Sequence, residues 1–306
     1  MKILIADKLE DEGIEILRKN GFDLDLKFSI SPEELKKEIK NYDGIIIRSR
    51  TKLTADILEN AKKLKVVGRA GVGLDNVDTK KAEQMGLKLL NTPEAPSVSV
   101  AELTIGLILS LARYISKADK TMHCGQWLKN DFMGYTLYGK KIGLIGFGNI
   151  GQEVAKRCVA FGMKVGIYDK DPKVIELAKK IGYKIYPKVD ELIQDVQIVS
   201  LHIPATVETE NTINEKRLKM MKKSTLIINT ARGNLVDEAA LIKALKNKEI
   251  GGAALDVYRE EPLKNLELCN CEDNLILTPH IASQTIETQT QASLMIAEKV
   301  SAFLKK

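Results

Sequence analysis

Three residues of complementary chemistry each follow a short apolar run in the second half of the chain. Arg232, Glu261 and His280 come after the runs at residues 226–229, 253–257 and 275–277. In an open parallel sheet, ligands bind outside the carboxyl ends of the strands, so we expect these side chains to meet at one edge. There an arginine can hold a carboxylate, a histidine can exchange a hydroxyl proton, and an acid can orient the imidazole. Hydride transfer to or from a cofactor needs this set of groups.

The chain has three histidines in all, so each alternative to His280 can be weighed. His202 also ends an apolar run and could line a cofactor site, but no acid is obviously placed to partner it. His123 is expected at the surface, in the linker after a long helix. A purely structural role is the alternative for His280 itself.

A glycine-rich turn lies near the middle of the chain, between an apolar run at 142–145 and a helix-like stretch at 152–161. A G-x-G-x-x-G pattern in this context lets the backbone approach a pyrophosphate and points the amides of a helix N-terminus at its charge. The residues expected to contact a dinucleotide are Gly146, Gly148, Asn149, Ile150 and Gly151. An ordinary glycine turn is the alternative.

An acid after the next apolar run indicates which dinucleotide is used. Asp169 directly follows residues 165–168, near the roughly 20-residue spacing at which an acid accepts the adenosine ribose hydroxyls. An aspartate there repels a 2′-phosphate, so NAD is expected in preference to NADP. Lys170, beside it, softens that preference.

Composition predicts a globular protein with two domains of ordinary size. The chain has 306 residues, of which 44% are hydrophobic and 29% charged, and a formal net charge of +6. Because the positive charge is spread along the chain, it suits a small anionic substrate, and no nucleic-acid partner is expected. The most apolar stretch, 98–111, is shorter than the roughly 20 residues of a membrane span, so no membrane partner is expected.

The cysteines indicate neither a disulfide framework nor a metal site. Cys124 and Cys158 are isolated, and one residue separates Cys269 from Cys271, which is a poor spacing for metal ligands. The chain begins with a strand pattern at 2–7 in place of a signal-peptide pattern. We therefore expect reduced thiols, no metal and a cytoplasmic location.

Short apolar runs alternate with amphipathic stretches, which predicts parallel sheets with helices on both faces. In the first part, strands are expected at 3–6, 24–28, 44–47, 65–67 and 87–90, with helices at 11–19, 31–39 and 54–61. Pro93 and Pro96 mark a domain boundary before one long helix at 98–117. After the glycine-rich turn, strands are expected at 165–168, 198–201, 226–229, 253–257 and 275–277, with a final helix at 283–306. The expected fold class is α/β, with two doubly wound, Rossmann-like domains and a cleft between them.

Several motifs occur in a characteristic order: residues 68–78, the glycine-rich turn, and residues 201–204, 229–233, 256–262 and 278–282. In this order they resemble the D-isomer-specific 2-hydroxyacid dehydrogenases. The resemblance implies that Arg232 binds the substrate carboxylate and that Glu261 and His280 form the acid-base relay. It places His202, Pro204, Thr230 and Asp256 at the cofactor, with Asp256 near the nicotinamide carboxamide.

The resemblance also implies that the final helix returns to the first domain. The substrate-binding domain would then comprise residues 1–95 plus 284–306, and the NAD-binding domain residues 96–283. Family members often carry a C-terminal amino-acid-binding domain, and a chain that ends at residue 306 predicts no serine feedback through one.

Two strand ends in the first domain narrow the substrate. Arg48, Ser49 and Arg50 follow one run, and Arg69 with the loop of Val72 and Gly73 follows the next. Two arginines flanking a hydroxyl suit a dianionic phosphate, and the amides of a glycine loop suit a carboxylate. Solvated surface arginines are the common alternative. Within the family this pattern favours a phosphorylated 2-hydroxy acid, with oxidation of D-3-phosphoglycerate to 3-phosphohydroxypyruvate, a step of serine synthesis, as the expected activity.

Trp127-Leu128-Lys129 resembles a segment that family members extend into a neighbouring subunit's substrate site. Lys129 is therefore expected to contact substrate in a homodimer, although a structural role for Trp127 is an equal alternative. A glyoxylate or hydroxypyruvate reductase, or another D-2-hydroxyacid dehydrogenase, is the alternative within the family. An NAD(H)-sensing binder related to transcriptional corepressors is the alternative from another class.

Overall fold

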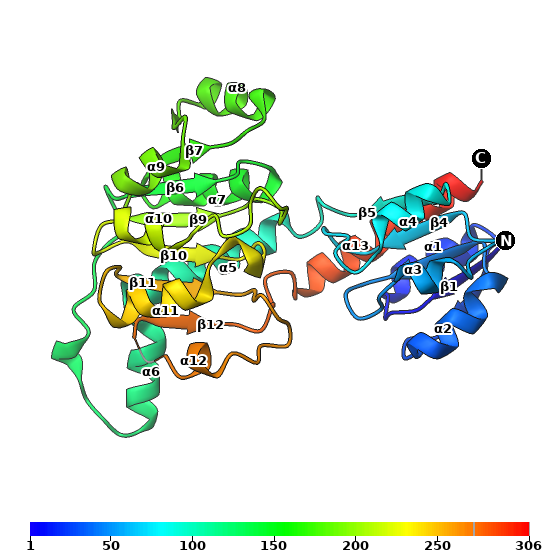
Figure 1. The fold of residues 1–306 in the computed structure, drawn as a ribbon, viewed down its shortest axis with the longest axis horizontal. Helices are drawn as coiled ribbons and strands as arrows, with labels where there is room; N and C mark the ends of the chain where they lie inside the picture. The colour runs from blue at the N-terminus through cyan, green and yellow to red at the C-terminus, as the bar shows by residue number, and fades with distance from the viewer. Residues whose placement is uncertain (272, 306) are drawn as a thin grey trace. The chain divides into compact units, whose positions relative to one another are not determined.

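A computed structural model describes residues 1–271 and 273–305 and divides the chain into two compact units (Figure 1). Unit 1 comprises Met1–Ser97 and Ser283–Lys306, and unit 2 comprises Val98–Ala282. Each unit is built around its own parallel sheet, with hydrophobic clusters on both faces. This arrangement confirms the predicted α/β, doubly wound class for both units.

Unit 1 contains a five-stranded sheet in the order β2-β1-β3-β4-β5. Its strands are β1 (Lys2–Ile5), β2 (Asp23–Leu26), β3 (Gly44–Ile47), β4 (Val66–Arg69) and β5 (Lys88–Asn91). Its helices are α1 (Asp11–Lys19), α2 (Pro32–Glu38), η1 (Ile39–Asn41), α3 (Ala55–Leu58), α4 (Thr79–Gln84) and α13 (Ile286–Leu304). The helix expected at 31–39 begins as its sequence predicts, because the Ser31 hydroxyl accepts from the backbone N of Glu34 at 3.2 Å.

Alternate side chains of β1 face opposite sides of this sheet, as the two-residue repeat of a strand requires. Ile3 and Ile5 pack in the cluster that includes α1 and α13, and Leu4 packs in the cluster that includes α2 and α3. Helix α13 approaches α1 closely because Gly13 has no side chain, and a Cβ there would lie 2.6 Å from the carbonyl oxygen of Ser293. The final helix is thus packed within unit 1 (Figure 1).

Unit 2 contains a seven-stranded sheet in the order β12-β11-β10-β9-β6-β7-β8. Its strands are β6 (Lys141–Ile145), β7 (Lys164–Tyr168), β8 (Lys184–Ile185), β9 (Ile198–Leu201), β10 (Leu226–Asn229), β11 (Gly252–Leu255) and β12 (Leu275–Leu277). Its helices are α5 (Ser97–Ala112), α6 (Ile115–His123), η2 (Lys129–Asp131), α7 (Asn149–Ala160), α8 (Pro172–Ile181), α9 (Val189–Asp195), α10 (Glu215–Met220), η3 (Gly233–Leu235), α11 (Glu238–Lys246) and α12 (Leu266–Cys269). The winding reverses between β6 and β9, which is where doubly wound sheets bind ligands.

The single helix expected at 98–117 is wrong, because the chain breaks into α5 and α6. Tyr114 adopts a left-handed conformation with φ 55°, and the two helices are bent by 67°. No glycine or proline marks this break, so no residue type signals it in the sequence. His123 is consequently the last residue of α6, where its ring lies 3.5 Å from the carboxylate of Asp119.

In the described part of the chain, no single helix is long and apolar enough to span a membrane. Helices α5 and α6 reach that length and hydropathy only when the bent pair is taken together. Much of α5 belongs to a hydrophobic cluster inside unit 2.

Candidate active site

The turn between β6 and α7 has the close packing of a dinucleotide site. Gly146 has φ 100°, and a Cβ there would lie 2.4 Å from the carbonyl oxygen of His202. A Cβ on Gly151 would lie 2.5 Å from the carbonyl oxygen of Gly146. Gly148, which precedes α7, faces open space instead, with no described atom within 4 Å of a Cβ. Two glycines let strand, turn and helix close up and the third leaves room before the helix, so these residues fit a pyrophosphate.

Asp169 follows β7 and holds this turn from the side. Its Oδ2 accepts from the backbone N of Phe147 at 2.7 Å, and its Oδ1 accepts from the backbone N of Asp171 at 2.9 Å. Because each carboxylate oxygen has two acceptor positions, both retain capacity for ribose hydroxyls. Nζ of Lys170 lies 2.8 Å from the carboxylate of Glu208. This negative charge offsets the positive charge of the lysine, which would otherwise weaken the repulsion between Asp169 and a 2′-phosphate.

His280 and Glu261 are in direct contact. Nδ1 of His280 lies 2.7 Å from Oε2 of Glu261, whose Oε1 accepts from the backbone N of Tyr258 at 3.1 Å. The hydrogen bond to Glu261 raises the pKa of His280 against the opposing effect of burial, and the charge of Asp256 adds to the rise. Burial acts to raise the pKa of Glu261, but the hydrogen bond and charge of His280, together with Arg232, lower it overall. The pair has the geometry of a proton-exchanging histidine oriented by a carboxylate.

Asp256 is fully buried and organises the segment that carries His280. Its Oδ1 accepts from the Thr278 hydroxyl at 2.6 Å and the backbone N of Ile281 at 2.9 Å, and its Oδ2 accepts from the backbone N of Ala282 at 2.9 Å. These bonds hold His280 in a left-handed conformation with φ 54°, which is uncommon outside glycine. The geometry therefore gives Asp256 a positioning role, and the nicotinamide contact that the resemblance implies stays a prediction.

Tyr258 is a further member of this site, beyond the residues predicted from the sequence. Its hydroxyl lies 3.1 Å from the carbonyl oxygen of Leu255 and 2.8 Å from that of Thr278, so it joins the ends of β11 and β12. It is buried, with 7% of its surface exposed. The signal that could have identified it is its place between Asp256 and Glu261 in one motif.

Arg232 follows β10, and the glycine after it lets this turn pack against the segment that leads to Glu261. A Cβ on Gly233 would lie 1.9 Å from the carbonyl carbon of Tyr258, so only glycine lets the turn after β10 pack there. The positive charge of Arg232 acts to lower the pKa of both His280 and Glu261. The three predicted residues thus follow the carboxyl ends of three adjacent strands, β10, β11 and β12, and His280 and Glu261 are in direct contact.

The remaining residues predicted to contact the cofactor follow β9 and β10. Nε2 of His202 lies 2.9 Å from the hydroxyl of Ser200, and burial lowers the pKa of His202 to about 4. The hydroxyl of Thr230 lies 3.0 Å from that of Thr104 on α5, and Pro204 is exposed. An imidazole that stays neutral can line a cofactor site but is a weak base at neutral pH.

Unit 1 gathers the predicted substrate residues at the ends of β3 and β4. Nη2 of Arg69 lies 3.3 Å from the hydroxyl of Ser49, and a Cβ on Gly71 would lie 2.7 Å from Nη1 of Arg69. Nδ2 of Asn91 on β5 donates to the carbonyl oxygen of Val72 at 2.6 Å and so holds the loop that continues to Gly73. Arg69, Ser49 and this loop are therefore neighbours.

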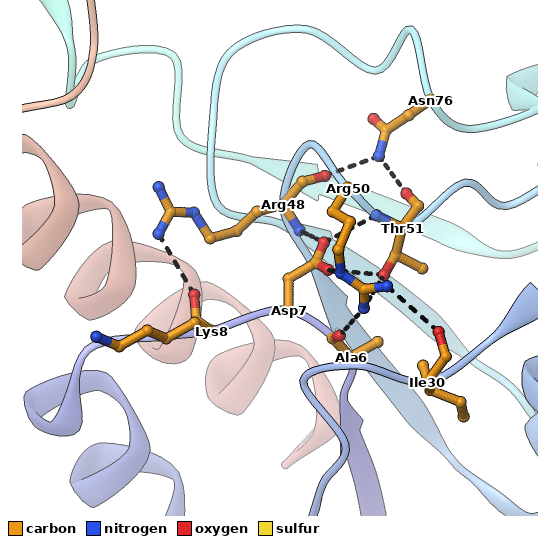
Figure 2. A network of polar contacts seen from close by, with 8 residues as sticks. All are labelled: Ala6, Asp7, Lys8, Ile30, Arg48, Arg50, Thr51 and Asn76. Carbon is orange, nitrogen blue, oxygen red and sulfur yellow. Dashed lines mark hydrogen bonds and ion pairs between the residues drawn. The ribbon is translucent and has the colours of Figure 1, made fainter. Parts of the chain in front are cut away.

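The two arginines after β3 point to different places (Figure 2). Nε of Arg50 lies 3.0 Å from the carboxylate of the buried Asp7, and its Nη2 donates to the carbonyl oxygen of Ala6 at 2.6 Å. Arg48 directs its guanidinium away from Asp7, with Nη1 3.4 Å from the carbonyl oxygen of Lys8. The geometry thus separates the two arginines and does not favour Arg50 as a phosphate ligand.

Lys129 lies in the arm of unit 2 formed by α6 and the connection to β6 (Figure 1). It is exposed, and Trp127 beside it is 77% exposed. In the described part of the chain, Lys129 makes no hydrogen bond or ion pair with Glu261 or His280. The structure of one chain therefore does not bring Lys129 to the histidine and glutamate.

The cysteines stand outside this site. All four are free, and burial raises the pKa of the Cys158 thiol to about 12. Among residues 1–271 and 273–305, no group of three or more His, Cys, Asp or Glu side chains is arranged to hold a metal ion.

The sequence of the chain matches a known protein family. Residues 105–282 match the family described as D-isomer specific 2-hydroxyacid dehydrogenase, NAD binding domain. A D-3-phosphoglycerate dehydrogenase of Methanocaldococcus jannaschii is 43% identical over 306 residues, which are 100% of this chain and 58% of that protein. The chain thus spans little more than half the length of this relative.

Two further matches extend over nearly the whole of both proteins. A hydroxypyruvate reductase of Thermotoga maritima is 41% identical, with 98% of this chain and 97% of that protein covered. A crystal structure of a protein from Thermus thermophilus has a TM-score of 0.89 at 33% identity, with 100% of this chain and 97% of that chain covered. Both the sequence and the fold are therefore shared along the full chain.

Proposed function

Because the chain belongs to the D-isomer-specific 2-hydroxyacid dehydrogenase family, we propose that it catalyses the NAD-dependent oxidation of D-3-phosphoglycerate to 3-phosphohydroxypyruvate. The observation that carries this proposal is the 2.7 Å contact between His280 and Glu261, with Arg232 following the adjacent strand β10. The likeness to the dehydrogenase of Methanocaldococcus jannaschii supports the choice of substrate. The product would supply serine synthesis.

In this reaction neutral His280 takes the proton of the substrate hydroxyl. Nε2 is the atom that accepts it, because Nδ1 is engaged by Glu261. Glu261 stabilises the imidazolium that forms, and Arg232 holds the substrate carboxylate and polarises the oxygen that becomes the carbonyl. NAD, when bound, accepts the hydride. The turn from Gly146 to Gly151 and the carboxylate of Asp169 would hold that cofactor.

Residues of unit 1 bind the ends of the substrate. Arg48 and Ser49 suit the phosphate, because a guanidinium and a hydroxyl together give charge-assisted hydrogen bonds to its oxygens. Arg69 is adjacent to Ser49 and to the loop of Val72 and Gly73, whose amides suit the carboxylate. Arg50 contributes to substrate binding indirectly, through its contact with Asp7.

We propose NAD as the preferred cofactor because Asp169 would repel a 2′-phosphate. The pairing of Lys170 with Glu208 supports this preference, since the lysine charge is offset within the same unit. An NADP-dependent enzyme would need a free cation at this position.

A hydroxypyruvate reductase is the second candidate. It is favoured by the relative from Thermotoga maritima, which matches over 97% of its own length. In that reaction imidazolium at His280 would donate a proton to the oxygen of a 2-oxo acid, with Glu261 and Arg232 in the same roles, and NADH, when bound, would supply the hydride. A reductase of unphosphorylated acids has little use for Arg48 beside Ser49, and this favours the phosphorylated substrate.

We further propose a homodimer that pairs through the arm of unit 2. The arm exposes large apolar side chains, with Trp127, Met133 and Tyr138 exposed by 77%, 85% and 81%. Such a group on one segment is typical of a surface that a second protein covers. A dimer would also explain how Lys129 could serve a neighbouring chain's substrate. A cytoplasmic location accords with four free thiols.

One set of assays tests the proposed activity. The purified chain is supplied with NAD or NADP and with D-3-phosphoglycerate, D-glycerate or D-lactate, and in the reverse direction with NADH or NADPH and with hydroxypyruvate or glyoxylate. We expect the highest kcat/KM for D-3-phosphoglycerate with NAD. A higher kcat/KM for hydroxypyruvate, or for D-glycerate, would identify a reductase of unphosphorylated acids instead. Binding of NADH without turnover of any acid would indicate a sensor.

A further inference from the structure

A buried aspartate at the end of β1 holds the loop that carries the two arginines after β3 (Figure 2). Asp7 is 4% exposed. Its Oδ2 accepts from the backbone N of Arg48 at 2.6 Å and from that of Thr51 at 3.1 Å. Its Oδ1 accepts from the Thr51 hydroxyl at 2.7 Å and lies 3.0 Å from Nε of Arg50. Because a carboxylate offers about four acceptor positions, this loop uses all of Asp7.

Arg50 and Asn76 make further hydrogen bonds that hold the same loop. Nη2 of Arg50 donates to the carbonyl oxygen of Ala6 at 2.6 Å and to the Thr51 hydroxyl at 3.1 Å. Nη1 of Arg50 donates to the carbonyl oxygen of Ile30 at 3.3 Å. Nδ2 of Asn76 donates to the carbonyl oxygens of Arg48 and Thr51 at 2.7 and 2.6 Å. Both the amides and the carbonyls of the loop are therefore fixed within unit 1.

We infer that Asp7 is a positioning residue for substrate and that Arg50 acts through Asp7. This inference rests on the function proposed above, in which Arg48 and Ser49 contact the substrate. Arg50 neutralises Asp7, so that a buried carboxylate does not repel an anionic substrate near the loop. The loop then presents the Arg48 guanidinium, which Figure 2 shows directed away from Asp7. Arg48 thus contacts the substrate, and Arg50 holds the loop.

Replacing Asp7 by asparagine isolates this role. An asparagine keeps the size of the side chain but has one acceptor oxygen and one donor NH₂ group. Each oxygen of Asp7 accepts from two groups, so either orientation of the amide sets NH₂ against at least one N–H donor. The loop is loosened while the apolar packing stays unchanged.

A second buried aspartate in the same unit provides a matched control. Asp43 is 5% exposed and precedes β3, at the opposite end from the arginine loop. It accepts from the backbone N of Lys2 at 2.7 Å and lies 3.2 Å from Nζ of Lys63. Asp43→Asn therefore removes comparable bonds from the same sheet without touching the loop.

The experiment measures KM and kcat for the parent and for Asp7→Asn, Asn76→Ala and Asp43→Asn, with thermal unfolding of each. D-3-phosphoglycerate, D-glycerate and hydroxypyruvate are all assayed, so the parent's preference tests the proposed function separately. For the parent's best substrate, we expect KM to rise about tenfold in Asp7→Asn and Asn76→Ala, with kcat changed less than about twofold. Asp43→Asn should lower Tm and leave KM unchanged. An unchanged KM in Asn76→Ala, or an equal rise in Asp43→Asn, would overturn the inference, even if Asp7→Asn does not fold.

A double-mutant cycle then tests whether Arg50 acts through Asp7. Arg50→Ala alone should raise KM by about the same factor as Asp7→Asn. The double variant should show about the tenfold rise of either single variant, because both remove one interaction. If the two effects multiply to about a hundredfold, Arg50 contacts the substrate independently, and its assignment to the loop is wrong.

Discussion

Nδ1 of His280 lies 2.7 Å from Oε2 of Glu261, which leaves Nε2 as the ring atom that can exchange a proton with a bound hydroxyl. We expect His280→Asn to lower kcat by about 10²–10⁴-fold, because an amide cannot act as a general base. Binding of NADH, followed by its fluorescence, should survive, since the glycine turn and Asp169 are unchanged. Near-normal turnover would transfer the role to another base, with His202 the first to test.

Glu261 should set the pH range of oxidation through His280. The hydrogen bond from His280 to Glu261 raises the pKa of His280, so the neutral imidazole that oxidation needs appears only at higher pH. In Glu261→Gln this effect is lost, the pKa of His280 falls, and the acid limb of the kcat/KM profile should move to lower pH. The measurement is kcat/KM for oxidation against pH.

A neighbouring acid controls for the loss of negative charge in that experiment. Glu260 is exposed and pairs with Lys264. Glu260→Gln should leave the acid limb where it is in the parent. A shift of the same size in both variants would mean that general charge, and not the contact with His280, sets the profile.

The sequence predicted the ends of the strands that matter most, because each is a short apolar run followed by a polar residue. Arg232, Glu261 and His280 lie at one sheet edge for this reason. The break at Tyr114 could not be predicted, since its backbone angle depends on packing and no glycine or proline marks it.

The hydrogen-bond partners of the buried acids could not be predicted from the sequence either. Asp256 and Asp7 each accept hydrogen bonds from residues that the fold brings from other strands. Periodicity locates a strand end but does not say which amides turn toward a carboxylate. The same limit applies to Arg50, whose direction depends on Asp7.

Asp169 should determine the choice of dinucleotide. Asp169→Ala should lower the ratio of kcat/KM for NAD to that for NADP by about tenfold or more, because it removes the ribose acceptor and the charge that repels a 2′-phosphate. Glu176→Ala, which removes an exposed acid that pairs with Lys180 on α8, is the control and should leave the ratio unchanged. Preference for NADP in the parent would contradict the assignment of NAD.

Gly233 should be essential for packing at the edge of the sheet. Gly233→Ala places a Cβ 1.9 Å from the carbonyl carbon of Tyr258, so backbone must shift. We expect the free energy of unfolding to fall by about 1–3 kcal/mol or more. Gly106→Ala, on α5 with no described atom within 4 Å of the new Cβ, should change it by less than about 1 kcal/mol. Equal stability of the two variants in urea unfolding would show that the turn after β10 is looser than the structure indicates.

Arg48 should give the protein its preference for a phosphorylated acid. The contact of Arg50 with Asp7 makes Arg48 the sharper of the two tests, since its guanidinium is directed away from the carboxylate (Figure 2). A charge-assisted hydrogen bond is worth about 1.5–3 kcal/mol, so Arg48→Ala should lower kcat/KM for D-3-phosphoglycerate by about tenfold or more. Activity on D-glycerate, which lacks the phosphate, should hardly change.

The measurement for this last prediction is the ratio of the two kcat/KM values in parent and variant. Lys52→Ala removes an exposed positive charge just beyond the loop and is the matched control, because a general electrostatic effect would appear there as well. If Arg48→Ala lowers kcat/KM for both acids equally, the arginine holds the loop or the carboxylate and not the phosphate. If the parent already prefers D-glycerate, the phosphate argument fails, and a reductase of small unphosphorylated 2-oxo acids becomes the better interpretation of Arg232, Glu261 and His280.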